Sequence, residues 1–180
     1  MSKTKTHRLF FALNPDERVR AAVVEYQRRL PGEGRAVPPP NFHVTLAFLG
    51  MQQPDVIPPV RKIASQLTFE PCRLTLDSIG HFRKAGVLWL GAKHVPPELQ
   101  KFQHALVDRL LRAEIGYDRK PWKFHLTLYR KMRKLPPIIE PVNIEWTLNS
   151  FSLIESVSVN RGVEYHSIGH WEAESGAGYQ

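Results

Sequence analysis

The sequence is poor in cysteine and contains no long apolar segment. Cys72 is the single cysteine of 180 residues, so no disulfide can form within the chain, and a reducing compartment is favoured. No apolar run approaches the roughly 18 residues that a membrane-spanning helix requires. The apolar residues 9–13 are too few for the core of a secretory signal, and Asn14 and Pro15 follow them directly. We therefore expect a cytoplasmic protein that does not enter a membrane.

Acidic residues are missing from one part of the chain, residues 119–134. The basic residues of that segment are Arg119, Lys120, Lys123, Arg130, Lys131, Arg133 and Lys134. The whole chain has a formal net charge of +8, which favours polyanionic partners and nucleic acid first among them. Taken alone, a basic run is better explained as a solvated surface. Its overlap with a repeated motif, described below, favours a functional role.

The first half of the chain has the order strand, helix, loop, strand. Residues 8–13 and 42–49 have the apolar character of strands. Asn14 suits the N-cap of a helix and Pro15 its first position. The apolar side chains of that helix recur at helical spacing at Val19, Ala22, Val23, Tyr26 and Leu30.

The second half repeats this order of elements. Strands are expected at residues 86–91 and 124–129, and the helix between them ends at Gly116. Its buried stripe is formed by Leu99, Phe102, Leu106 and Leu110. The remaining elements are a helix at residues 56–67 and strands at residues 73–79, within 144–158 and at 162–171.

No low-complexity linker separates the two halves. We therefore expect one α+β domain over residues 1–180, built from two pseudo-symmetric lobes. Each lobe would have an antiparallel or mixed sheet with helices on its outer side and a cleft facing the other lobe. Residues 1–6 and 172–180 have the composition of mobile tails.

The two halves share a phrase of five residues. It is Phe-His-Val-Thr-Leu at residues 42–46 and Phe-His-Leu-Thr-Leu at residues 124–128. Successive side chains of a strand point to opposite faces, so the histidine and threonine share one face and the apolar residues share the other. Two lobes that face each other would bring two histidines and two hydroxyls into one cleft.

The same alternation predicts where the neighbours of the motif point. Tyr129 falls on the face of His125, where it could line the cleft or stack on a base. Phe48 falls on the core face of the first strand. Arg130 falls on the face opposite His125 unless the second strand ends at Tyr129.

Paired histidines favour one chemistry over two others. Zinc is disfavoured because two histidines are a thin ligand shell and neither phrase contains an acid or a cysteine. A Ser-His-Asp site is disfavoured because no nucleophile elbow is present and the second histidine would have no role. Phosphodiester hydrolysis needs one group that accepts a proton from water and one that gives a proton to the leaving oxygen. Threonine hydroxyls can donate hydrogen bonds to the phosphate oxygens, and such a site requires neither metal nor cofactor.

Both phrases, with residues 8–13 before them and 87–91 between them, resemble the two-histidine phosphoesterase superfamily. Within it, the chain is most similar to bacterial and archaeal RNA 2′,3′-cyclic phosphodiesterases, also called 2′-5′ RNA ligases, from about residue 7 to residue 171. The resemblance implies a bilobal fold and metal-independent opening of a terminal 2′,3′-cyclic phosphate to a 2′-phosphate.

The resemblance also implies roles for individual residues. His43 would be the proton donor to the leaving 3′ oxygen, and His125 would be the acceptor that activates water. Thr45 and Thr127 would bind the phosphate, and Arg130 would make a weaker contact with phosphate or RNA. The implied partners are RNA with 2′,3′-cyclic phosphate ends or nucleoside 2′,3′-cyclic phosphates, bound by a monomer.

Two other interpretations of the sequence remain open. Joining a 2′,3′-cyclic end to a 5′-hydroxyl is the same chemistry in the reverse direction, so a 2′-5′ RNA ligase would have the same motifs. A module that binds RNA without catalysis would keep the cleft and the basic surface, although the intact histidines of both motifs argue against it.

Overall fold

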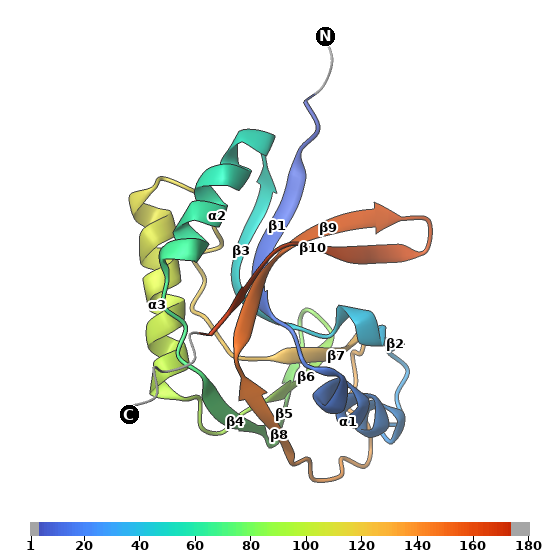
Figure 1. The fold of residues 1–180 in the computed structure, drawn as a ribbon. Coiled ribbons are helices and arrows are strands. Elements are labelled where there is room, and N and C mark those ends of the chain that lie inside the picture. The colour runs from blue at the N-terminus through green and yellow to red at the C-terminus, as the bar shows by residue number, and fades with distance from the viewer. Residues whose placement is uncertain (1–3, 174–180) are drawn as a thin grey trace, which may run out of the picture.

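Most strands of the protein form one antiparallel sheet with the order β10-β9-β1-β3-β7-β6-β5, and β2 is added beside β7 (Figure 1). These strands are β1 (His7–Leu13), β2 (Arg35–Ala36), β3 (Val44–Gln52), β5 (Ser78–Phe82), β6 (Val87–Gly91), β7 (Leu126–Arg130), β9 (Ser150–Val159) and β10 (Gly162–Glu172). A second, two-stranded sheet pairs β4 (Cys72–Leu76) with β8 (Ile144–Leu148). The expected strand at residues 73–79 is therefore two strands that belong to different sheets.

The structure is a computed structural model that describes residues 4–173. Residues 1–3 and 174–180, which make up much of the two expected tails, lie outside the described residues. Glu172 belongs to β10, and the backbone N–H of Ala173 donates to the carbonyl of Asn149 at 2.6 Å. The chain is thus bonded to the sheet up to the end of the described part.

The helices are α1 (Glu17–Arg28), α2 (Ile57–Gln66) and α3 (Pro97–Arg112), with short 3-10 helices η1 (Pro39–Asn41) and η2 (Pro54–Val56). Most of the expected apolar stripes are buried, with Val19, Val23, Tyr26, Leu30, Leu99, Phe102, Leu106 and Leu110 in the core. No helix within residues 4–173 has the length and hydropathy to cross a membrane.

Two helix ends differ from the sequence prediction. The N-cap of α1 is Asp16 and not Asn14, because the Asp16 carboxylate accepts the N–H of Val19 at 2.8 Å and adds its charge to the positive end of the helix. The helix α3 stops at Arg112, before Gly116, and Glu114 makes the left-handed turn with φ 56°.

Each helix of the repeated unit packs against strands of the other half. Helix α1, which connects β1 to β3, packs against β8 and lies beside β7, whereas α3, which connects β6 to β7, packs against β3. In Figure 1, α2 and α3 lie together on one side of the molecule and α1 lies on the other. The two halves of the chain are therefore interlocked, because the helix of each half packs on strands of the other.

A buried glutamine in each of these two helices forms a hydrogen bond to the other half of the chain. The Nε2 of Gln27 in α1 donates to the carbonyl of Leu128 at 2.9 Å, and the Nε2 of Gln103 in α3 donates to the carbonyl of Leu46 at 3.1 Å. Both side chains are buried, and both carbonyls belong to the residue that follows a motif threonine. Since a buried amide without a partner is costly, each glutamine fixes its helix against the motif strand of the other half.

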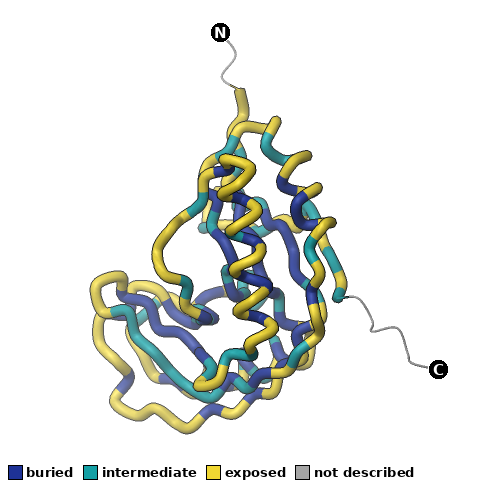
Figure 2. Tube along the Cα trace, turned by 90° about the vertical axis from the view of Figure 1, so that its left-hand side faces the viewer, coloured by how far each residue is buried: buried dark blue, intermediate teal, exposed yellow. Residues whose placement is uncertain are grey.

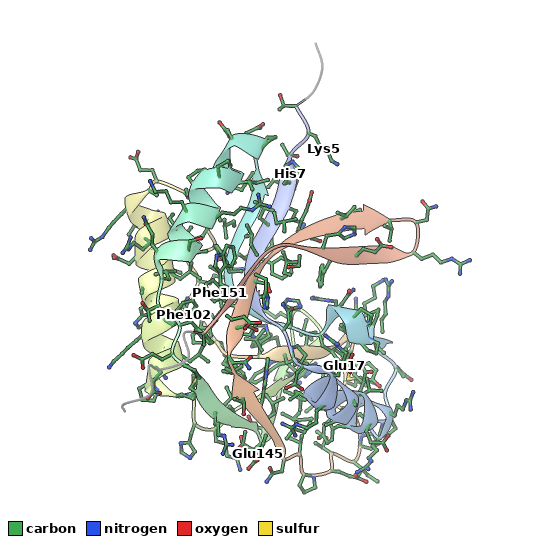
Figure 3. All side chains as sticks on the ribbon, in the orientation of Figure 1. Lys5, His7, Glu17, Phe102, Glu145 and Phe151 are labelled. Atoms are coloured by element: carbon green, nitrogen blue, oxygen red, sulfur yellow. The ribbon has the colours of Figure 1, made fainter. Side chains whose placement is uncertain are left out.

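The core is concentrated along the strands, and the outer turns of the helices are exposed (Figure 2). Aromatic side chains fill the space between α3 and β9, where the rings of Phe102 and Phe151 lie 4.7 Å apart (Figure 3). These rings pack against the sheet on the side away from α1. The motif strands β3 and β7 lie at the centre of the sheet.

Candidate active site

The two motif strands lie side by side at the centre of the sheet. β3 and β7 run antiparallel and pair through Val44 and Leu126. Extending this register by one residue in each direction places Thr127 opposite His43 and Thr45 opposite His125, all on one face. The structure thus brings the four motif side chains together, with the histidines on the diagonal, where positions lie about 7–8 Å apart.

His43 is held by two hydrogen bonds and two aromatic rings. Its Nδ1 lies 2.8 Å from the carbonyl of Asn41, which can only accept, so Nδ1 carries the proton of the neutral ring. Its Nε2 lies 3.0 Å from Oγ1 of Thr45, whose hydroxyl therefore donates to it. The rings of Phe10 and Tyr165 lie 4.9 and 5.2 Å away. This arrangement fixes one tautomer and one orientation of the imidazole.

His125 is held in a related way. Its Nδ1 donates to the carbonyl of Lys123 at 2.7 Å, two residues earlier in the chain, as with His43. The rings of Phe82 and Trp89 flank it at 5.2 and 5.9 Å. No hydrogen bond within residues 4–173 involves its Nε2, which differs in this respect from that of His43.

Burial lowers the pKa of both histidines. The pKa of His43 falls to about 4, chiefly through burial, against the opposing effect of the Asn41 carbonyl, and Arg130 and His125 lower it further. The pKa of His125 is also lowered, chiefly by burial, with contributions from Arg130 and Lys123 and with the Lys123 carbonyl opposing. Both rings are therefore neutral near pH 7 in the free site, and a bound phosphate anion would raise both pKa values.

Each motif strand contains a register shift directly after its threonine. Between β1 and β3, Ala12 pairs with Thr45 and Phe11 with Ala47, which leaves Leu46 as an extra residue. Between β6 and β7, the shift leaves Leu128 extra in the same position relative to the motif. An extra residue of this kind is a β-bulge, and it exchanges the faces of the residues directly after it. In β3 the exchange extends to Phe48, because a second register shift with β1 leaves Leu49 extra.

The two bulges correct three predictions made from simple alternation. Phe48 was expected in the core but is half-buried and lines the cleft. Tyr129 was expected in the cleft but is buried, and its hydroxyl donates to the carbonyl of Gln27 at 2.9 Å. Arg130 was expected on the face opposite His125, but it is exposed, and its charge acts on both histidines. The sequence contains no signal for the bulges, because they depend on the register with β1 and β6.

A groove of about 1070 Å³ opens beside His125 and Thr45. Phe48, Trp89 and Trp122 are among the residues that line it. A smaller cavity of about 280 Å³ lies on the other side of the site, beside His43. The two histidines therefore face spaces of very different size.

Other candidate groups in the described residues do not form a competing site. No cluster of three or more His, Cys, Asp or Glu side chains between residues 4 and 173 is placed to hold a metal. Burial, together with Glu98 and Glu70, raises the pKa of the Cys72 thiol to about 11, which makes it a poor nucleophile.

A pair of histidine-threonine strands that meet at the floor of a cleft, with an arginine beside them, defines a two-histidine phosphoesterase. Comparison with known proteins agrees with this class. The chain belongs to the 2′-5′ RNA ligase superfamily, whose family model matches residues 15–160. The α+β fold and the family resemblance predicted from the sequence are thereby confirmed.

Individual relatives cover nearly the whole chain. An RNA 2′,3′-cyclic phosphodiesterase of Thermus thermophilus is 35% identical over 173 residues, which cover 88% of this chain and 86% of the relative. One of Archaeoglobus fulgidus is 29% identical over 174 residues, covering 89% and 97%. The crystal structure of Escherichia coli LigT complexed with 3′-AMP superimposes with a TM-score of 0.88 at 26% identity, covering 95% of this chain and all of that one.

Proposed function

We propose that the protein is an RNA 2′,3′-cyclic phosphodiesterase, a hydrolase that opens a terminal 2′,3′-cyclic phosphate to a 2′-phosphate without a metal. The observation that carries the proposal is the pairing of Val44 with Leu126, which places the two motif histidines on one face and on a diagonal. A phosphorus atom above this pair would have an imidazole on each side. The names of the relatives from Thermus and Archaeoglobus support the same activity.

The reaction is a displacement at phosphorus. His125 in its neutral form accepts a proton from water through Nε2, and the water oxygen forms the new bond to phosphorus. The bond from phosphorus to the 3′ oxygen breaks, and the proton on Nε2 of His43 moves to that oxygen. The ring opens, the 2′-phosphate remains, and the two histidines exchange a proton through solvent before the next turnover.

Three further residues stabilise the charge that develops on the phosphate. The hydroxyls of Thr45 and Thr127 lie on the face of the histidines and donate hydrogen bonds to the non-bridging oxygens. Arg130 comes to this face through the bulge at Leu128 and adds a positive charge beside both histidines.

The proton-donor role of His43 depends on the substrate. With a pKa of about 4, the free imidazole carries almost no proton at pH 7. A bound phosphate anion favours the imidazolium, so substrate binding and protonation of His43 occur together. The Thr45 hydroxyl, which donates to Nε2 of the neutral ring, is then released to donate to the phosphate.

We expect the protein to act as a monomer, because the sequence itself supplies both copies of the histidine-threonine motif. The single cysteine fits the expected cytoplasmic location. Ligation to a 2′-5′ bond is the reverse reaction and would require a 5′-hydroxyl to compete with water, so hydrolysis is favoured.

The direct test is incubation with a nucleoside 2′,3′-cyclic phosphate in the presence of EDTA, with the 2′- and 3′-monophosphates resolved by chromatography. The 2′-phosphate is the expected product. A 3′-phosphate would exchange the leaving oxygen and so contradict the orientation of the substrate. A protein that opens neither a mononucleotide nor an RNA end would contradict the activity itself.

A further inference from the structure

The two motif histidines differ in the residue that lies two positions before each of them. The carbonyl of Asn41 accepts the N–H of His43 Nδ1 at 2.8 Å. The carbonyl of Lys123 accepts the N–H of His125 Nδ1 at 2.7 Å. The side chains are unlike, because the amide of Asn41 is neutral and donates to the carbonyl of Val163 in β10 at 3.1 Å, whereas that of Lys123 ends in a cation. The same backbone contact therefore brings a positive charge close to one histidine only.

The ammonium of Lys123 lies over the same two rings that flank His125. It is 4.8 Å from the ring centroid of Trp89 and 5.9 Å from that of Phe82. The imidazole lies 5.9 and 5.2 Å from these two rings, and the rings lie 5.2 Å from each other. An aromatic ring attracts a cation within about 6 Å of its centroid. The two rings thus hold the exposed side chain of Lys123 on the side of the imidazole.

The larger of these rings, that of Trp89, is fixed against the sheet. Gly80 of β5 pairs with Trp89 of β6, and a Cβ at Gly80 would overlap the carbons of the indole. A Cβ at Gly91 would lie 2.6 Å from the same ring. The indole therefore occupies space that two glycines leave free, and only 8% of Trp89 is exposed. The ring that supports both the ammonium and the imidazole has little room to move.

Few charged or titratable groups act on His125. Burial lowers its pKa most, and Arg130 of β7 and the ammonium of Lys123 lower it further. His43 lies across the site on β3, where a charge on one imidazole disfavours a charge on the other. The strands β5 and β6 present the two uncharged rings described above. Arg130 acts on both histidines, whereas Lys123 lowers the pKa of His125. A bound phosphate favours a proton on either imidazole, so a group that acts on both does not decide which of them receives it.

We propose that Lys123 is a positioning residue that keeps the imidazole of His125 free to accept a proton. Its ammonium disfavours a second positive charge beside it, so the proton that accompanies substrate binding goes to His43, whose equivalent neighbour is the neutral Asn41. Lys123 acts through His125 and needs no contact with the substrate. The proposal rests on the proposed function, because it concerns how one imidazole becomes the acid and the other the base.

The experiment titrates His125 by NMR and measures kcat/KM against pH with a nucleoside 2′,3′-cyclic phosphate. Lys123→Met removes the charge but keeps an unbranched apolar chain on the two rings, and Lys123→Arg keeps the charge. Lys120→Met is the matched control, because Lys120 is an exposed lysine of the same segment whose ammonium lies 4.0 Å from the carboxylate of Asp118. The signal of His125 is assigned as the one that is missing from His125→Gln.

In Lys123→Met the pKa of His125 should rise, whereas Lys123→Arg and Lys120→Met should leave it unchanged. Below that pKa, kcat/KM of Lys123→Met should be about two- to threefold lower than that of the wild type, because more of the proton acceptor is already protonated. Well above that pKa the two proteins should have the same kcat/KM. The difference at low pH should decrease as ionic strength rises from about 0.01 M to about 1 M, since salt screens an exposed charge.

The proposal is overturned if the pKa of His125 is the same in Lys123→Met and the wild type, or if Lys120→Met shifts it equally. It is also overturned if Lys123→Met lowers kcat/KM by one factor at every pH, which would mean that Lys123 contacts the substrate or only supports the site. Failure of the proposed function is a separate result, in which the wild type opens no cyclic phosphate. The NMR titration requires no turnover, so in that case it still decides whether Lys123 keeps the proton from His125.

Discussion

The two halves of the protein present the same motif in different surroundings. His43 has its Nε2 bonded to Thr45 and faces a cavity of about 280 Å³. His125 has the same backbone anchor but lies at the end of a groove of about 1070 Å³, beside the ammonium of Lys123. The anchor is thus shared, whereas the access to solvent and the second hydrogen bond are not.

This difference shows how a duplicated motif can supply two unlike groups. An acid and a base are distinguished by their environment and not by their residue type. The larger space suits the residue that must reach water, and the smaller space suits the residue whose proton goes to an oxygen of the bound ribose. This difference is the reason for proposing His125 as the proton acceptor and His43 as the donor.

The largest effect should come from removing either imidazole. His43→Ala and His125→Ala should each lower kcat by about a hundredfold or more, since positioned acids and bases contribute about 10²–10⁴-fold. The rates would be measured with the cyclic mononucleotide, and the far-UV circular dichroism of both variants should match the wild type. His94→Ala, which changes an exposed histidine outside the site, is the control and should keep full activity. Full activity in either motif variant would show that the halves do not share the chemistry.

The hydroxyls should have the next largest effect. Thr45→Val and Thr127→Val keep the shape of the side chain and remove the hydrogen bond to the developing charge, so each should lower kcat by about a hundredfold. Thr45→Ser and Thr127→Ser are the matched controls and should recover most of the rate. Valine variants with wild-type kcat would mean that the hydroxyls bind no phosphate oxygen in the transition state.

Arg130 couples the two halves electrostatically, and its removal should change both histidines together. Because a nearby cation disfavours the imidazolium, Arg130→Gln should raise the pKa of His43 from about 4 and also raise that of His125. Titration of the imidazole signals by NMR would measure both shifts. Arg133→Gln removes a charge from the same basic run and should leave both pKa values unchanged. A shift in one histidine alone would place Arg130 nearer to one half than the structure has it.

The buried glutamines should give the smallest effects on rate and a clear effect on stability. Gln27→Leu and Gln103→Leu each remove a buried hydrogen bond to the motif strand of the other half, which should lower the free energy of unfolding by about 0.5–1.5 kcal/mol. Urea denaturation would measure the loss. Gln66→Leu changes a glutamine at the exposed end of α2 and serves as the control. Variants as stable as the wild type would show that the packing of α1 and α3 against the other half does not depend on these hydrogen bonds.

The sequence predicted the elements of the fold and the four motif side chains, because both follow from local patterns. Alternation in two short strands was enough to place His43, Thr45, His125 and Thr127 on equivalent faces. It failed for the residues beyond Leu46 and Leu128, since a bulge is set by the partner strand and leaves no trace in the strand's own apolar pattern.

The sequence did not predict that each helix packs against the other half of the chain, for a related reason. Helical periodicity shows which face of α1 or α3 is buried, but not which strands cover it. Gln27 and Gln103 are polar residues in helices and gave no sign that they are buried. Only the packing of one half on the other reveals their role.

The exchange of α1 and α3 between the halves has a consequence for how such a protein could arise. A single half, with its helix displaced from its own strands, has no covered core, but two copies can each cover the other. Such mutual exchange of an identical element is the arrangement of a domain-swapped homodimer. The present chain has the architecture that such a dimer would have if its two subunits were joined end to end. In a joined chain the two copies of the active-site strand need not be identical, as His43 and His125 with their different surroundings illustrate.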